Sequence, residues 1–118
     1  MNLVTDGVIV LVALLHAYFL MLEMFLWDKP IGLKAFAQTR EKAAATKVLA
    51  ANQGLYNGFL AAGLIFGVVQ GADGIAFKIF FLSCVVIAGI YGALTFSRKI
   101  FFIQALPAIV GLCLLTFS

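Results

Sequence analysis

Four long apolar runs, separated by short polar segments, dominate the pattern of this chain. They cover about residues 7–27, 48–69, 75–96 and 100–117. A transmembrane helix needs about 20 mostly apolar residues at 1.5 Å rise per residue, and each run approaches that length. The pattern therefore predicts an all-α fold: an integral membrane bundle of four transmembrane helices that forms a single domain over residues 1–118.

The polar residues that flank the runs predict where helices begin and end. Thr5 and Asp6 can cap the first helix, because their side-chain oxygens accept hydrogen bonds from its free amides. Trp27 suits the headgroup zone at the other end, and Pro30 disfavours helix at Lys29. Residues 70–74 and 97–99 are expected to be short turns between antiparallel helices.

The connector between the first two runs, residues 28–47, is long and basic. We expect the second helix to begin near Thr39 or Arg40, in water, and a small amphipathic helix at 31–36 to lie on anionic headgroups. Seven of the eight Lys and Arg residues fall in this connector and in the turn at 97–99. The positive-inside rule then predicts a multi-pass membrane protein with the connector in the cytoplasm and both termini on the non-cytoplasmic side.

Composition supports the membrane prediction. Hydrophobic residues make up 64% of the chain and charged residues 11%, with a mean hydropathy of +1.14, whereas soluble domains carry about 25% charged residues. Topology explains the net charge of +3, and no nucleic-acid motif is present. We expect no cofactor and no metal, because one histidine and one membrane carboxylate are too few ligands within one chain, although two subunits could supply more.

Two ionisable residues interrupt the first apolar run. Glu23 lies about 6 Å and His16 about 16 Å from its inner end. Seven positions at 100° per residue return to within about 20° of the same face, so both side chains point the same way. This spacing makes Glu23 and His16 the candidate catalytic pair, able to exchange protons with a bound molecule.

Other polar residues are expected at a similar depth. The other three runs bring them to about 6–14 Å from the inner ends of their helices. Their common level predicts one polar chamber in the cytoplasmic half, while the apolar outer half argues against an open pore. The candidate ligand-binding residues are Asn52, Gln53, Tyr56, Asn57, Tyr91, Gln104 and Trp27.

Three functions remain open for this cluster. An interhelical hydrogen bond is worth about 0.6 kcal/mol, less than the roughly 2.5–3.5 kcal/mol cost of a central carboxylate, which favours function over helix fastening. The first hypothesis is a chamber that binds, and by acid–base chemistry processes, a small amphipathic or lipid-like ligand. The alternatives are a proton-coupled small transporter and a non-catalytic assembly subunit of a membrane complex; whether the protein is an enzyme is left open.

Glycine pairs predict close helix packing. Gly54 and Gly58 form a GxxxG motif, and Gly63 and Gly67 form another. Such pairs bring backbones together either within one bundle or between the two copies of a homodimer, and the sequence leaves both open. Pro107 is expected to disturb the fourth helix by removing a backbone donor.

Two segments carry a resemblance to a known family. HAYFLMLEMFLW, from His16, and KVLAANQGLYNGFLAAGL, from Lys47, are similar to signature segments of small four-helix bacterial membrane proteins catalogued as a domain of unknown function. Some members of that family are labelled epimerases. The resemblance implies an architecture, a site and a location in the bacterial cytoplasmic (inner) membrane, but no reaction. This chain shows no nucleotide-binding glycine loop that would support the epimerase label.

Overall fold

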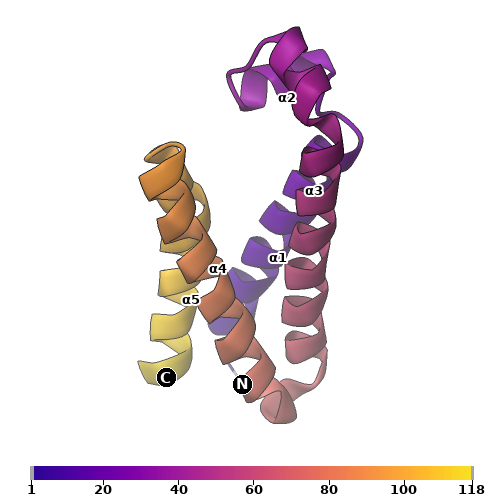
Figure 1. The fold of residues 1–118 in the computed structure, drawn as a ribbon. Helices are drawn as coiled ribbons and strands as arrows, with labels where there is room; N and C mark the ends of the chain where they lie inside the picture. The colour runs from indigo at the N-terminus through magenta and orange to yellow at the C-terminus, as the bar shows by residue number, and fades with distance from the viewer. Residues whose placement is uncertain (1, 118) are drawn as a thin grey trace. The chain divides into compact units, whose positions relative to one another are not determined.

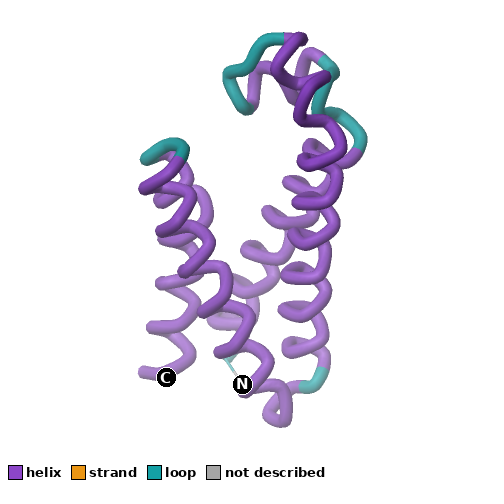
Figure 2. Tube along the Cα trace, in the orientation of Figure 1, coloured by secondary structure: helices purple, strands orange, loops and turns teal. Residues whose placement is uncertain are grey.

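The structure, a computed structural model, describes residues 2–117 and consists of helices joined by short turns and loops (Figures 1 and 2). No strand occurs within that range, which confirms the all-α prediction. A 3₁₀ turn, η1, and a π-helical segment, η2, accompany the five helices. The elements are α1 (Leu3–Met24), α2 (Pro30–Ala35), α3 (Arg40–Val69), η1 (Gly71–Gly74), α4 (Ile75–Thr95), η2 (Phe101–Ala105) and α5 (Leu106–Phe117).

Two segments are long and apolar enough to cross a membrane: α1 and Gly71–Thr95, which joins η1 to α4. Phe101–Phe117 is a shorter apolar helix. The predicted second span lies in α3, where the amides of Asn52, Gln53 and Asn57 lower the mean hydropathy. The coarse prediction of an all-helical chain with membrane-spanning segments therefore has support from two helices, and the four-span bundle stays a prediction.

The predicted cap of the first helix is wrong. α1 begins at Leu3, so Thr5 and Asp6 lie inside its first turns instead of ahead of it. Asn2 occupies the capping position, where its Oδ1 accepts a hydrogen bond of 2.7 Å from the backbone N–H of Val4. Asparagine is as good an N-cap as aspartate, so the helix gains an extra turn that the apolar pattern does not reveal.

The connector follows its prediction more closely. Lys29 is extended, with φ −89° and ψ 161°, and Pro30 opens α2 at the position where its missing N–H costs nothing. α3 begins at Arg40, after Thr39, whose Oγ1 accepts a hydrogen bond from the N–H of Lys42. The expected small helix and the expected polar start of the second long helix are both present.

The chain divides into two compact units, one of residues 1–15 and 60–118 and one of residues 16–59. In the first unit, α1, α3, α4 and α5 all contribute to one apolar core. Alanines on α1, α3 and α5 alternate there with larger aliphatic side chains on α1, α3 and α4. The core residues are Ile9, Val12, Ala13, Ala61, Leu64, Leu82, Val85 and Ala108.

The π-helical segment η2 packs closely against α4. A Cβ added at Gly89 of α4 would stand 2.6 Å from the backbone nitrogen of Ala105, so only glycine fits there. The N–H of Leu106 bonds to the carbonyl of Phe101, five residues back. The disturbance expected at Pro107 takes this form, because a wider turn accommodates the missing proline donor and the bulk of its ring.

One ion pair joins the start of α1 to the start of α4 in the first unit. Lys78 is fully buried, and its Nζ donates a 3.0 Å hydrogen bond to Oδ1 of Asp6. The stem of Lys78 crosses Gly67, where an added Cβ would meet Lys78 Cγ at 3.0 Å. Lys78 is the basic residue on the minority side of the predicted topology, and this pairing neutralises it locally.

Removal of Asp6 should expose the cost of that burial. We predict that Asp6→Asn lowers the free energy of unfolding by about 3 kcal/mol, because it leaves the Lys78 ammonium buried without a counter-charge. The double variant Asp6→Asn/Lys78→Met should recover most of the loss. Denaturant unfolding of the full chain in detergent measures both. Asp73→Asn, an exposed acid in η1, is the control expected within about 0.5 kcal/mol of wild type; equal stability of Asp6→Asn and this control would contradict the prediction.

Candidate functional site

The centre of the candidate site is a hydrogen bond between α1 and α3 in the unit of residues 16–59. Glu23 is 6% exposed and Asn57 is 8% exposed. Asn57 Nδ2 donates to Glu23 Oε1 at 2.5 Å. The carboxyl of Glu23 is therefore buried between α1 and α3 and is held there by an amide donor.

Glycines on α3 allow α1 to come close enough for this bond. A Cβ added at Gly54 would stand 2.7 Å from Met24 Cγ and 3.1 Å from Glu23 Cβ. One added at Gly58 would stand 2.6 Å from Leu20 Cδ1. The first GxxxG motif therefore packs against α1 of the same chain.

The second GxxxG motif also meets its own chain. Gly63 lies against the ring of Phe81, and Gly67 lies against Lys78. A homodimer through either glycine pair stays a prediction.

His16 lies on the same face of α1 as Glu23 and is fully buried. Its ring meets Phe19 edge-on, with centroids 5.2 Å apart and an interplanar angle of 73°. Seven residues separate His16 from Glu23, which corresponds to about 10.5 Å along the helix axis. The two side chains are therefore too far apart for a direct hydrogen bond, and a ligand or water would have to connect them.

Three predicted ligand-binding residues of α3 do not join Glu23. Asn52, Gln53 and Tyr56 are exposed. Asn52 is five positions from Asn57, about 140° around the helix, and Tyr56 is about 100° around. Gln53 is only about 40° from Asn57 around the helix, yet its side chain is exposed. The binding role of all three residues stays a prediction.

The remaining predicted residues lie on other elements. Tyr91 on α4 is 69% exposed, and Gln104 is half-buried within η2; both belong to the first unit and stay predictions as ligand contacts. Trp27 is half-buried, and its Nε1 donates a 3.1 Å hydrogen bond to Thr46 Oγ1. Trp27, just after the end of α1, is therefore linked to the first turns of α3.

An exposed ion pair strengthens the same junction. Lys47 Nζ donates a 3.0 Å hydrogen bond to Asp28 Oδ2. Asp28 and Lys47 stand next to Trp27 and Thr46 in the sequence, so two adjacent links join the end of α1 to the start of α3. We call these two links, Trp27 to Thr46 and Asp28 to Lys47, the clip. Sequence reasoning missed the clip, in which each pair of partners is 19 positions apart.

No three His, Cys, Asp or Glu side chains gather into a metal-binding group between residues 2 and 117. A shallow hollow of about 320 Å³ lies on α4 between Ala76, Phe77, Phe80 and Phe81. It is lined by apolar side chains and contains none of the predicted site residues.

Alanine substitutions at Gly54 and Gly58 should lower the stability of the protein by different amounts. We predict that Gly54→Ala lowers the free energy of unfolding by about 1–3 kcal/mol, because the new methyl group meets Met24, Glu23 and the Leu20 carbonyl at 3.3 Å. Gly58→Ala should cost less, because only the mobile end of Leu20 opposes it. Thermal unfolding in detergent ranks the two variants, and a larger loss for Gly58→Ala would contradict the described packing.

The clip at the connector should open in acid. The hydrogen bond from Lys47 lowers the pKa of Asp28 below its ordinary value, and the charges of Lys47 and Lys29 add to this effect. A lowered pKa in the folded state means that the contribution is complete above about pH 4 and is lost as pH falls through the lowered value. The emission of Trp27 should therefore change below about pH 4 in wild type but not in Asp28→Asn. An identical acid transition in Asp28→Asn would contradict this assignment.

Comparisons with known proteins agree with the resemblance seen in the sequence. Residues 10–116 match the family described as "Protein of unknown function (DUF1304)". The chain is similar to the "Uncharacterized protein YpaA" of Lactococcus lactis subsp. lactis (strain IL1403), with 30% identity over 114 residues that cover 95% of this chain and 96% of that protein. No solved structure matches. The match over nearly the whole length shows that this chain belongs to the DUF1304 family.

Proposed function

We propose that this chain is a multi-pass membrane protein that binds a small amphipathic or lipid-like ligand at Glu23. The observation that carries the proposal is the burial of an ionisable carboxyl, that of Glu23, in an apolar helix pair where Asn57 holds its Oε1. A hydrogen bond between membrane helices contributes about 0.6 kcal/mol on average, less than the roughly 2.5–3.5 kcal/mol cost of a central carboxylate, so helix fastening alone explains the acid poorly. A fixed, buried acid suits a group that meets a ligand.

Membrane residence is supported by the apolar surface that the fold leaves uncovered. In the most apolar stretch of α1 only 33% of residues are buried, and in that of Gly71–Thr95 only 28%. Water would penalise so large an uncovered apolar surface, whereas acyl chains would not. The helices are thus suited to lipid, with the basic connector on the cytoplasmic side and both termini outside.

The spacing of the two ionisable groups indicates the kind of ligand. His16 and Glu23 are about 10.5 Å apart along the same helix face, and the chain around them is apolar. A molecule that contacts both needs polar atoms spread over about two helical turns and an apolar part, which describes an amphipathic compound. Proton exchange with such a ligand would use Glu23 as the acid or base and His16 as the second group.

One observation favours a second candidate, a non-catalytic assembly subunit. The bond between Asn57 and Glu23 links two helices, as a purely structural pair would. In that role the polar pair would set the register of α1 against α3 and need no ligand. The two proposals differ in their expectation for a variant that replaces the Glu23 carboxyl with an uncharged group of the same shape. Only the ligand proposal expects that variant to lose bound molecules.

Glu23→Gln is the variant that separates them. Glutamine keeps an oxygen for Asn57 but cannot ionise, so the helices should stay paired while ligand binding falls at least tenfold. Mass spectrometry of the organic extract from equal amounts of purified wild type and variant measures the bound compounds. Glu41→Gln, an exposed glutamate of α3, is the matched control and should retain them. Equal recovery from wild type and Glu23→Gln would refute the ligand proposal.

The membrane orientation has its own test. We predict that reporter domains fused to either terminus of the full chain are active only outside the cytoplasm, because seven of the eight Lys and Arg residues lie on the opposite side. A reporter placed in the connector should show the reverse. Termini found on both sides in equal amounts would contradict the prediction and would instead support the small proton-coupled transporter alternative.

A further inference from the structure

The connector, residues 28–47, holds all of the net charge of this protein. Five basic side chains stand against Asp28 and Glu41, a net charge of +3 that equals the net charge of the whole chain. Elsewhere three acidic residues balance three basic ones. The basic residues of the connector are Lys29, Lys34, Arg40, Lys42 and Lys47.

Four of these five basic side chains form no ion pair within the described residues. Lys47 pairs with Asp28, whereas no ion pair reaches the other four within the described residues, and all four are exposed. On α2 the exposed face carries Ile31, 47% exposed, one turn before Lys34. An apolar side chain beside a free ammonium is the pattern of a segment that lies at a lipid headgroup boundary.

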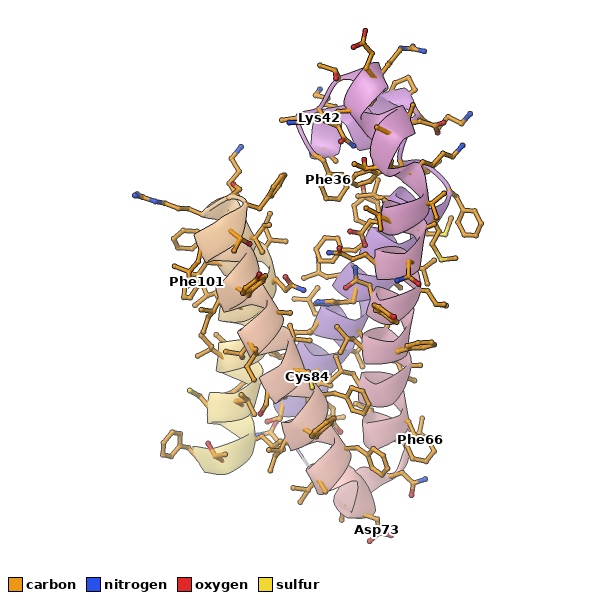
Figure 3. All side chains as sticks on the ribbon, in the orientation of Figure 1. Phe36, Lys42, Phe66, Asp73, Cys84 and Phe101 are labelled. Carbon is orange, nitrogen blue, oxygen red and sulfur yellow. The ribbon has the colours of Figure 1, made fainter. Side chains whose placement is uncertain are left out.

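The connector is also internally braced. The indole of Trp27 packs on the ring of Phe36, with centroids 4.8 Å apart, and bonds to Thr46. Gly32 lies against the backbone carbonyls of Leu26 and Trp27, where a Cβ could not fit. Figure 3 shows Phe36 and Lys42 within this segment. The charges are therefore presented by an ordered platform instead of a loose loop.

The fold of α2 ends in a way that keeps the platform compact. Ala37 adopts the left-handed conformation, with φ 49°, and the N–H of Gln38 bonds to the carbonyl of Leu33. This is the Schellman motif that ends many helices. Glycine normally occupies the left-handed position, because alanine is strained there by about 1 kcal/mol. The surrounding contacts hold the turn in spite of that strain.

We propose that residues 28–47 form a docking surface for the headgroups of anionic phospholipids in the same membrane. This rests on the proposed membrane residence but not on the ligand site at Glu23. The surface offers up to four free cations and one apolar anchor, Ile31, and phosphate headgroups supply the complementary charge. The contacts of Trp27 and Asp28 keep the cations outside the helix pair, where headgroups lie.

The single tryptophan of the chain makes the proposal measurable without a label. The full chain is reconstituted in phosphatidylcholine nanodiscs that contain an equal mole fraction of either brominated phosphatidylglycerol or brominated phosphatidylcholine. Bromine quenches Trp27, so greater quenching by the anionic lipid reports its enrichment at the platform. We expect greater quenching by phosphatidylglycerol, and the preference should weaken in 0.5 M salt.

Two double variants that each remove two positive charges serve as the test and its control. Lys34→Gln/Lys42→Gln should lower the preference for phosphatidylglycerol by roughly 10- to 30-fold, at about fivefold per basic residue. Arg98→Gln/Lys99→Gln removes the same charge from the turn between α4 and η2 and should retain the preference. Equal loss in both variants would show an effect of net charge alone and overturn the proposal.

Quenching of Trp27 in the wild-type protein tests membrane residence and the docking surface separately. Equal quenching by both lipids would overturn the docking surface while leaving membrane residence intact. Absence of quenching by either lipid would contradict membrane residence and the docking surface together. Inorganic phosphate at millimolar concentration should not abolish the preference, and its loss under those conditions would indicate a site for free phosphate and sink the lipid assignment.

Discussion

The hydrogen bond between Asn57 and Glu23 is the interaction on which the account of this molecule depends. A carboxyl group within an apolar helix pair is costly unless a donor meets it. Asn57 supplies that donor from α3, and glycines on the same helix let α1 approach closely enough to accept it. The bond then fixes which face of α1 and which face of α3 meet at Glu23 and Asn57.

The sequence predicts the helices because long apolar runs with short polar breaks allow few alternatives. The basic start of the second long helix, at Arg40, and the short helix before it follow from helix propensity and from Pro30. The start of the first helix escaped prediction, because Asn2, Thr5 and Asp6 are all acceptable caps and only packing decides among them. The span of α3 is ambiguous because the amides that mark the site also make the helix less apolar.

The candidate site was predictable approximately in depth but not in direction. Counting residues from a helix end gives an approximate axial position, about 6 Å for Glu23 and about 12–14 Å for Asn57, and the hydrogen bond between them shows the error of such a count. The rotation of α3 about its axis depends on which face its glycines turn toward α1, and this leaves Asn52 and Tyr56 exposed. The pairing of Asp6 with Lys78 joins residues 72 positions apart, a separation at which no local pattern gives a signal.

The most direct test of the central interaction is a double-mutant cycle between α1 and α3. Glu23→Leu, Asn57→Leu and the double variant are unfolded in the same detergent, and the coupling free energy follows from the four stabilities. If the two side chains meet as described, the coupling should reach at least about 0.6 kcal/mol, the average for a polar contact between membrane helices. A coupling of zero would show that the carboxyl and the amide act independently, and the site built on them would not exist.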